Sequence, residues 1–141
     1  MDYEYLEDEA TADLAIRAYG NNLKKAFENT AKALINAIAE TGSVEEQEIK
    51  LVAKSSENIQ ALLYDFLGEI IYLHDSEGIV FRTVRVEELD EKNNAVSAVL
   101  KGEKYDKNKH KPVYEVKAIT YFGMKIEKTV KGYEINVTVD L

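Results

Sequence analysis

The chain has 141 residues, no cysteine, and 18 lysine and arginine residues against 26 aspartate and glutamate residues, which gives a formal net charge of -8. The absence of cysteine excludes a disulfide framework and a thiolate metal site. The acidic balance argues against direct nucleic-acid binding, which needs a basic face to replace the counterions of phosphates. The length is typical of one domain, and we predict a single domain over residues 1–141.

The start of the sequence predicts no secretory signal, because its first ten residues are acidic and lack an apolar run. No stretch approaches the roughly 20 apolar residues that a membrane span needs. We therefore expect a cytoplasmic protein that does not associate with membranes.

Two strands and a helix are predicted at the start of the chain. Residues 3–6 predict a short strand with Tyr3 and Tyr5 on one side. Over 13–19 apolar and polar side chains alternate, which is typical of a half-buried strand. Asn22 is a suitable N-cap for the helix that follows. This helix is expected to bury one face, made of Leu23, Phe27, Ala31, Leu34, Ile35 and Ile38.

The middle of the chain predicts a strand over 47–54 and a second helix that begins at Ser55 or Ser56. The helix has apolar residues at three- and four-residue spacing, and we interpret them as core: Ile59, Leu62, Leu63, Phe66, Leu67, Ile70 and Ile71. From there on the pattern changes to alternation. It predicts strands over 79–89, 95–103, 113–122, 124–130 and 133–140, with a tight hairpin at Lys131 and Gly132.

These elements indicate an α+β fold, with two helices packed on a mostly antiparallel β-sheet or sandwich. In the last strand, Ile135, Val137 and Val139 share one face, so Asp140 lies on the polar face. Asp13 lies on the polar face of its own strand in the same way. Aspartate is disfavoured within strands, which makes both positions candidates for a function.

Enzyme patterns are missing from the sequence. There is no glycine-rich phosphate loop and no serine–histidine–aspartate arrangement, so no catalytic residue is assigned. His74 and His110 lie in polar turns and are interpreted as surface or loop histidines rather than ligands. Lysines cluster near residue 105, where a solvated loop is favoured over a phosphate-binding patch: Lys101, Lys104, Lys107, Lys109 and Lys111.

The end of the chain offers a second carboxylate beside Asp140. If the last strand stays ordered to its end, the terminal carboxylate of Leu141 lies close to the Asp140 side chain. If the strand of Asp13 is its neighbour, three carboxylates converge. At an effective dielectric constant near 20, two charges about 4 Å apart repel by about 4 kcal/mol. Such a cluster is protonated, spread apart or neutralised by a hard cation, and oxygen ligands favour Ca²⁺ or Mg²⁺.

The whole chain resembles the archease family in an ordered series of segments. The segments that carry the resemblance are Tyr5-Leu6-Glu7, Thr11-Ala12-Asp13-Leu14, Ile16-Arg17-Ala18-Tyr19-Gly20, Phe66-Leu67-Gly68-Glu69-Ile70-Ile71, Gly102-Glu103, Glu115-Val116-Lys117-Ala118-Ile119-Thr120-Tyr121 and Val137-Thr138-Val139-Asp140. The resemblance implies a non-catalytic activator of an RtcB-type RNA ligase in tRNA splicing, which promotes guanylylation and multiple turnover of that ligase.

The resemblance also implies a divalent metal site made of Asp13, Asp140 and the terminal carboxylate of Leu141. Calcium or magnesium is expected there, and manganese is compatible. Lys117 matches a lysine of the family and is a candidate contact to the ligase, with a plain surface lysine as the equal alternative.

The chain departs from the family where Ala10 and Phe122 replace residues that are often histidine. Both changes leave the three carboxylates in place. Two other functions remain open: a chaperone-like interaction module without a metal role, and a metal-dependent hydrolase, for which the sequence offers no identifiable acid or base.

Overall fold

The structure is a computed structural model that describes residues 1–7 and 13–141. Residues 8–12, which include the Ala10 departure, lie outside these residues. The elements follow one another as β1 (Tyr3–Glu7), β2 (Leu14–Gly20), α1 (Leu23–Ile38), a short 3-10 turn η1 (Thr41–Ser43), β3 (Glu48–Ser55), α2 (Ile59–Glu77), β4 (Ile79–Asp90), β5 (Ala95–Lys104), β6 (Ala118–Thr129) and β7 (Gly132–Asp140).

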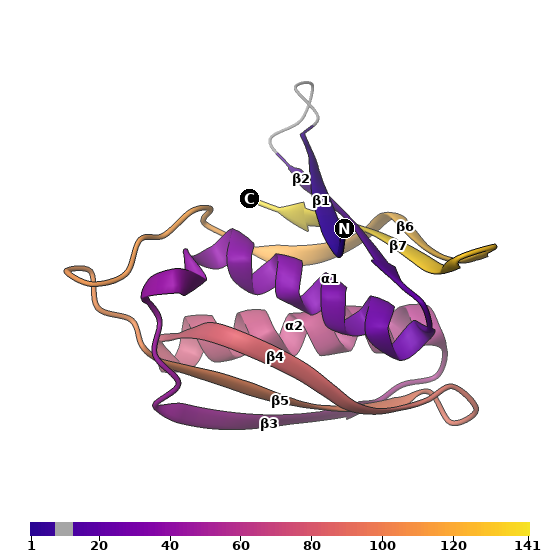
Figure 1. Cartoon of the computed structure of the whole chain (residues 1–141), viewed down its shortest axis with the longest axis horizontal. Helices are drawn as coiled ribbons and strands as arrows, with labels where there is room; N and C mark the ends of the chain where they lie inside the picture. The colour runs from indigo at the N-terminus through magenta and orange to yellow at the C-terminus, as the bar shows by residue number, and fades with distance from the viewer. Residues whose placement is uncertain (8–12) are drawn as a thin grey trace.

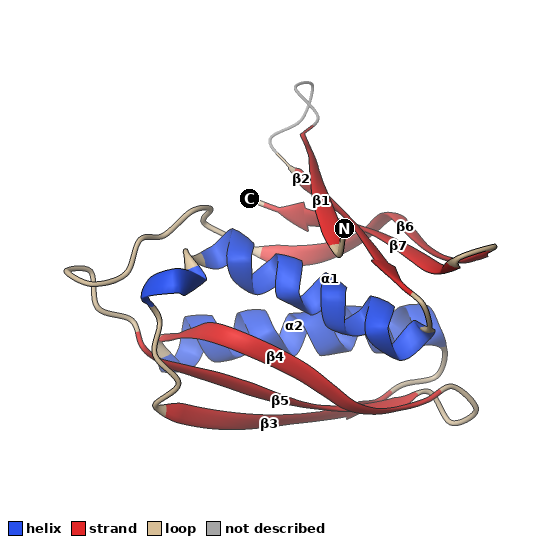
Figure 2. Ribbon diagram, viewed as in Figure 1, coloured by secondary structure: helices blue, strands red, loops and turns tan. Residues whose placement is uncertain are grey.

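The strands form two antiparallel sheets with both helices between them (Figure 1). One sheet has four strands in the order β1-β2-β7-β6, and the other has three in the order β3-β5-β4. The layers are seen edge-on in Figure 2, where the helices lie between the sheets. The α+β class with antiparallel strands is confirmed. In the described ranges, neither helix is long and apolar enough to cross a membrane.

α1 is buried around most of its circumference, so the expectation of one buried face is wrong. The helix contacts β2 on one side and β4 on the other. The expected apolar face is buried, and a second set of buried residues consists of small or short side chains: Ala26, Asn29, Thr30, Ala33 and Ala37. Small side chains let a second sheet approach the helix closely. The prediction used the spacing of large apolar residues alone, so it missed this face.

α2 supplies the centre of the core. Six of the seven residues expected in the core are buried, and Ile59 is half-buried at the start of the helix. Burial of each large apolar side chain contributes about 1.5–3 kcal/mol relative to exposure. The helix begins at Ile59 rather than at Ser55 or Ser56, because Asn58 caps it by accepting a hydrogen bond from the Ala61 N–H at 2.8 Å.

The carbonyl groups at the end of α1 are bonded by a distant segment. The Val113 and Tyr114 N–H groups donate to the carbonyls of Ile38 and Ala37 at 3.1 and 2.9 Å. Residues 113–117 are therefore not part of a strand, although the alternating pattern predicted one over 113–122. These bonds hold the connection between β5 and β6 against the end of the helix.

β6 is one strand, whereas the sequence predicted a break into 113–122 and 124–130. Its pairing with β7 shifts between Thr120 and Lys125, and Gly123 lies there with a positive φ of 72°. A glycine in this conformation lets the strand bulge and continue, and a bulge is hard to distinguish from a strand end in sequence. The predicted hairpin between β6 and β7 is present, but its turn is at Val130 and Lys131, and Gly132 is the first residue of β7.

Candidate functional site

Two aspartates from opposite ends of the chain meet at one end of the four-stranded sheet. In the antiparallel pair of β2 and β7, Leu14 lies opposite Val139. One further step in this register places Asp13 opposite Asp140. Residues directly opposite each other have Cβ atoms roughly 5 Å apart, so both carboxylates can reach one ion. In Figure 1 the C-terminus lies next to the start of β2.

Both aspartates lie on the face that points away from the helices. Leu14 and Val139 are buried toward the core, and side chains alternate along a strand, so the neighbours Asp13 and Asp140 point outward. Asp13 is half-buried and Asp140 is exposed. The pair is thus accessible to an ion and to another molecule.

The end of the chain is held in place beside these aspartates. Asp140 pairs with Ala118 of β6, and its carbonyl accepts a hydrogen bond from the Lys117 N–H at 2.8 Å. The side chain of Leu141 is half-buried against the core. The main-chain end of Leu141 therefore lies beside Asp140, directly after β7.

The site is short of positive charge. Over residues 1–7 and 13–141, no salt bridge is formed by either Asp13 or Asp140. The same ranges contain no group of three or more histidine, aspartate or glutamate side chains that could hold a metal ion. The side chains thus offer two carboxylates, and the main-chain end of Leu141 lies beside them. This oxygen donor set fits a hard cation such as Ca²⁺ or Mg²⁺.

Lys117 lies near this end of the sheet, and Phe122 lies further along β6. Lys117 is exposed and directly precedes the residue opposite Asp140. Phe122 is 80% exposed in the bulge of β6. The side chain that replaces the family's second histidine is therefore free to contact another molecule, but it offers no metal ligand.

Sequence reasoning missed a polar network around Glu103 and His110. His110 is 4% exposed, so the expectation of a histidine in an open polar turn is wrong. Its Nδ1 accepts a hydrogen bond from the Asp106 N–H at 2.9 Å, which leaves Nε2 to donate to Glu103 at 3.0 Å. Glu103 also accepts hydrogen bonds from the Lys109 ammonium at 3.0 Å and from the Glu45 N–H at 2.7 Å. The network folds residues 105–110 back over β5.

Hydrogen bonds from Lys109, the Glu45 N–H and His110 lower the pKa of Glu103 from 4.5 to about 2. Because the pKa is lower in the folded state, the carboxylate stabilises the fold above pH 4.5, and this contribution is lost as the pH falls toward 2. We expect Glu103→Gln to lower the free energy of unfolding at pH 7 and to converge with wild type near pH 2. Urea unfolding across this range measures the difference, with the exposed Glu127→Gln as control. A difference independent of pH would contradict this assignment.

The lysine cluster is mostly paired with carboxylates or carbonyls. Lys109 contacts Glu103 and Glu45, and the Lys104 ammonium donates to the carbonyl of Glu77 at 2.8 Å. Lys101 lies 4.0 Å from Glu46. These partners occupy the charges that a phosphate would need, which agrees with the interpretation as a solvated loop.

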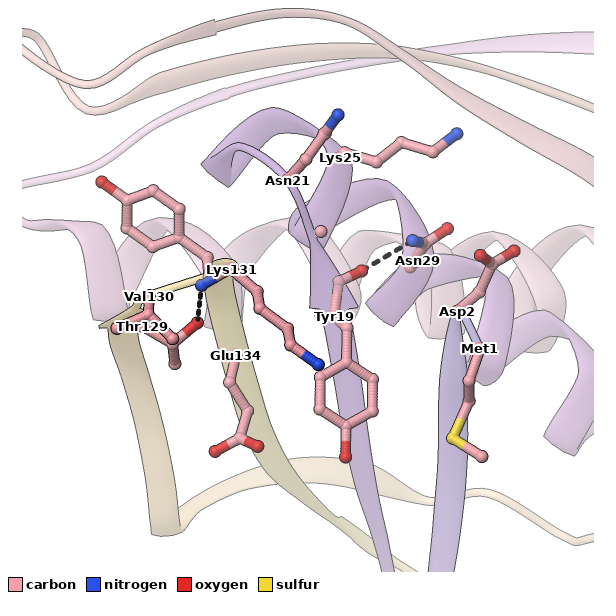
Figure 3. Close-up of a pocket in the computed structure, with 12 residues that line it drawn as sticks. Met1, Asp2, Tyr19, Asn21, Lys25, Asn29, Thr129, Val130, Lys131 and Glu134 are labelled. Carbon is pink, nitrogen blue, oxygen red and sulfur yellow. Dashed lines mark hydrogen bonds between the residues drawn. The ribbon is translucent and has the colours of Figure 1, made fainter.

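A hollow of about 810 Å³ lies at the opposite end of the four-stranded sheet, between the start of β1 and the β6–β7 hairpin (Figure 3). Its polar groups largely bond to one another. The Asn29 amide donates to the carbonyl of Tyr19 at 2.7 Å, and the Lys131 N–H donates to the Thr129 hydroxyl at 3.3 Å. The hollow therefore presents no converging set of free donors and acceptors, and the candidate site remains the carboxylate pair.

A sequence model of the Archease protein family matches residues 3–141. The chain belongs to the archease family. It is 42% identical over 141 residues to protein archease of Methanosarcina acetivorans, which covers 99% of this chain and 95% of that protein. It is 47% identical over 125 residues to protein archease of Pyrococcus abyssi, which covers 88% of each.

Two solved structures share the fold. The solution structure of protein 1598 from Methanobacterium thermoautotrophicum superimposes with a TM-score of 0.82 at 31% identity, over 99% of this chain and 98% of that one. A crystal structure from Thermotoga maritima, described as an archease and possible chaperone, gives a TM-score of 0.54 at 21% identity, over 95% of this chain and 91% of that one. The second likeness concerns the fold alone.

Proposed function

We propose that this protein is a non-catalytic activator of an RtcB-type RNA ligase, which promotes guanylylation and multiple turnover of that ligase in tRNA splicing. Membership of the archease family supports this proposal. The observation that carries it is the register of β2 and β7, which brings Asp13 opposite Asp140 beside the end of the chain. In this proposal the ligase performs the chemistry.

Asp13, Asp140 and the terminal carboxylate of Leu141 hold a divalent cation in this proposal. Calcium or magnesium suits the oxygen donors, and manganese is compatible with them. A bound cation would supply positive charge at an outward-facing surface. The chain's own residues have two tasks: the carboxylates bind the ion, and the bond from the Lys117 N–H to the carbonyl of Asp140 holds the strand end in position.

Lys117 is the proposed contact to the ligase. Its side chain is exposed beside the carboxylates, so a partner that approaches the cation also approaches this lysine. The acidic charge of the chain complements a partner that binds RNA through basic surfaces.

Asp13→Ala is expected to abolish stimulation of ligase guanylylation, because it removes one of the two side-chain ligands. Changes to residues that merely support a metal ligand cost about 10–100-fold in metal affinity, and loss of a ligand costs at least as much. The measurement is the rate of guanylylation of purified ligase with GTP and Mn²⁺, with and without this protein.

The matched control for this experiment is Glu127→Ala, which removes one exposed carboxylate from β6 of the same sheet. It is expected to stimulate like wild type. Circular dichroism confirms that both variants fold. Normal stimulation by Asp13→Ala would contradict the proposed role of the cation.

A chaperone-like function is the second candidate. It is favoured by large apolar side chains that are exposed on strands, with Leu51 at 79% and Phe122 at 80%. The Thermotoga maritima structure described as a possible chaperone has the same fold. Suppression of aggregation of a client protein would then persist in Asp13→Ala, whereas the activator function would not.

A further inference from the structure

β3 is an edge strand with a free side. In the described part of the chain, it pairs with β5 along all of its length and with no other strand. Figure 1 shows it at the margin of the molecule, below β5. A free edge presents unpaired N–H and C=O groups, which makes it a template for a strand from another chain.

The outward row of β3 is apolar, which is unusual for an exposed edge. Ile49 is 60% exposed and Leu51 is 79% exposed on the face away from the helices. Ala53 continues the row, and Val99 of β5 lies opposite Leu51. Proteins commonly protect free edges with charged residues, and β3 carries its charged residues in the inward row alone.

The inward row holds the strand firmly against the body of the protein. Lys50 contacts Glu77 at 2.8 Å and Lys54 contacts Glu69 at 3.1 Å, and both glutamates belong to α2. Val52 between the lysines is buried. The edge is therefore a preformed surface.

We propose that β3 pairs with β3 of a second copy of this chain, antiparallel, around a two-fold axis at Leu51. The outward rows of the two copies lie on the same face of the joined sheet when the two-fold axis passes through a residue rather than between two residues. Near the centre of β3, the axis can pass through Lys50, Leu51 or Val52. An axis at Lys50 would place Lys50 of one copy opposite Lys50 of the other. An axis at Val52 would place Lys50 against Lys54. Opposite like charges destabilise a strand pair.

An axis at Leu51 removes both conflicts. It places Glu48 of each copy opposite Lys54 of the other, so two ion pairs form by symmetry. It also places Leu51 against Leu51 and Ile49 against Ala53 in the outward row. The sequence of the strand is thus complementary to itself in this register.

The pairing joins the two three-stranded sheets into one continuous sheet. The carboxylate site lies on the other sheet, beyond the helices, and stays accessible in both copies. The dimer therefore does not depend on the proposed function, and either can fail without the other.

Cross-linking tests the register directly, because the chain has no cysteine of its own. In Leu51→Cys the two thiols face each other, with Cα atoms about 4.5–5.5 Å apart, which is within the range for a disulfide. We expect this variant to form a disulfide-linked dimer on mild oxidation. Ile49→Cys should stay uncross-linked, since its two thiols lie about 13 Å apart in this register. The double variant with Ile49→Cys and Ala53→Cys should cross-link again.

Sedimentation equilibrium tests the dimer without a covalent bond. We expect wild type to dimerise and Leu51→Arg to raise the dissociation constant at least about 10-fold. Leu51 is largely exposed, so this variant folds. Val130→Arg, at a fully exposed apolar position in the β6–β7 hairpin, is the control and should behave like wild type. A monomeric wild type at about 1 mM, or cross-linking of Leu51→Cys no faster than that of Val130→Cys, would overturn the proposal.

Discussion

Appending glycine and serine after Leu141 is expected to lower the affinity for Ca²⁺ by about 100-fold or more. The extension turns the carboxylate of Leu141 into an amide, which moves its negative charge two residues away and leaves a single carbonyl oxygen at Leu141. Mutation of a residue that only supports a metal ligand lowers metal affinity about 10–100-fold, and loss of a charged ligand lowers it at least as much. Isothermal titration calorimetry with Ca²⁺, and separately with Mg²⁺, measures the change.

A stability measurement gives a second readout of the same extension. A ligand at 100 times its dissociation constant raises the free energy of unfolding by about 2.7 kcal/mol. Wild type should gain about this much on addition of Ca²⁺, and the extended chain should gain almost none. Leu141→Val is the matched control, because it keeps the terminal carboxylate while changing the half-buried side chain. Equal calcium affinity in the extended chain and wild type would exclude Leu141 as a ligand.

The same extension separates the two proposed functions. Activation of the ligase through a cation needs the terminal carboxylate, so stimulation of guanylylation should fall together with calcium affinity. A chaperone-like surface around Leu51 would be unaffected, because the extension lies on the opposite sheet. Loss of metal binding with full stimulation would exclude a role for the cation in activation.

Sequence periodicity predicted the elements whose signal is local. The apolar residues of α2 recur at helical spacing, and those of β2 and β7 alternate, so each burial face was readable from residues a few positions apart. The outward orientation of Asp13 and Asp140 follows from this alternation alone. Their proximity does not, because it depends on the pairing of β2 with β7 across more than a hundred residues of chain.

Other features escaped prediction because their causes are not local. His110 became buried when residues 105–110 folded over Glu103, and nothing near His110 in the sequence marks its partner. Similarly, Ala33 and Ala37 carry no strong hydrophobic signal, yet they form the face of α1 that a second sheet covers. Such positions are decided by the tertiary arrangement rather than by local preference.

Gly102→Ala is expected to destabilise the fold by about 3 kcal/mol, which is the upper part of the usual range for overpacking. A Cβ atom at this position would lie 2.0 Å from the carbonyl oxygen of Val80 and 2.8 Å from the Cα of Phe81. These are backbone atoms of β4, which cannot rotate away as the end of a side chain could. Urea unfolding at pH 7 measures the loss.

Gly68→Ala is the matched control, with the opposite expected sign. Gly68 lies within α2, and a Cβ atom there meets nothing within 4 Å. Alanine in a helix interior is favoured over glycine by about 1 kcal/mol, so this variant should be more stable than wild type. The same chemical change thus stabilises or destabilises according to the space around it.

The pair of variants tests how closely β4 approaches β5 beside the Glu103 network. Gly102 lies opposite Phe81, next to the shift in register between Phe81 and Thr83, so the close approach follows from the bulge that bends β4. If Gly102→Ala cost less than about 1 kcal/mol, β4 would have room to move away from β5. The carboxylate of Glu103 bonds to Glu45, Lys109 and His110 and not to β4, so the pH dependence expected for Glu103→Gln should be unchanged in that variant.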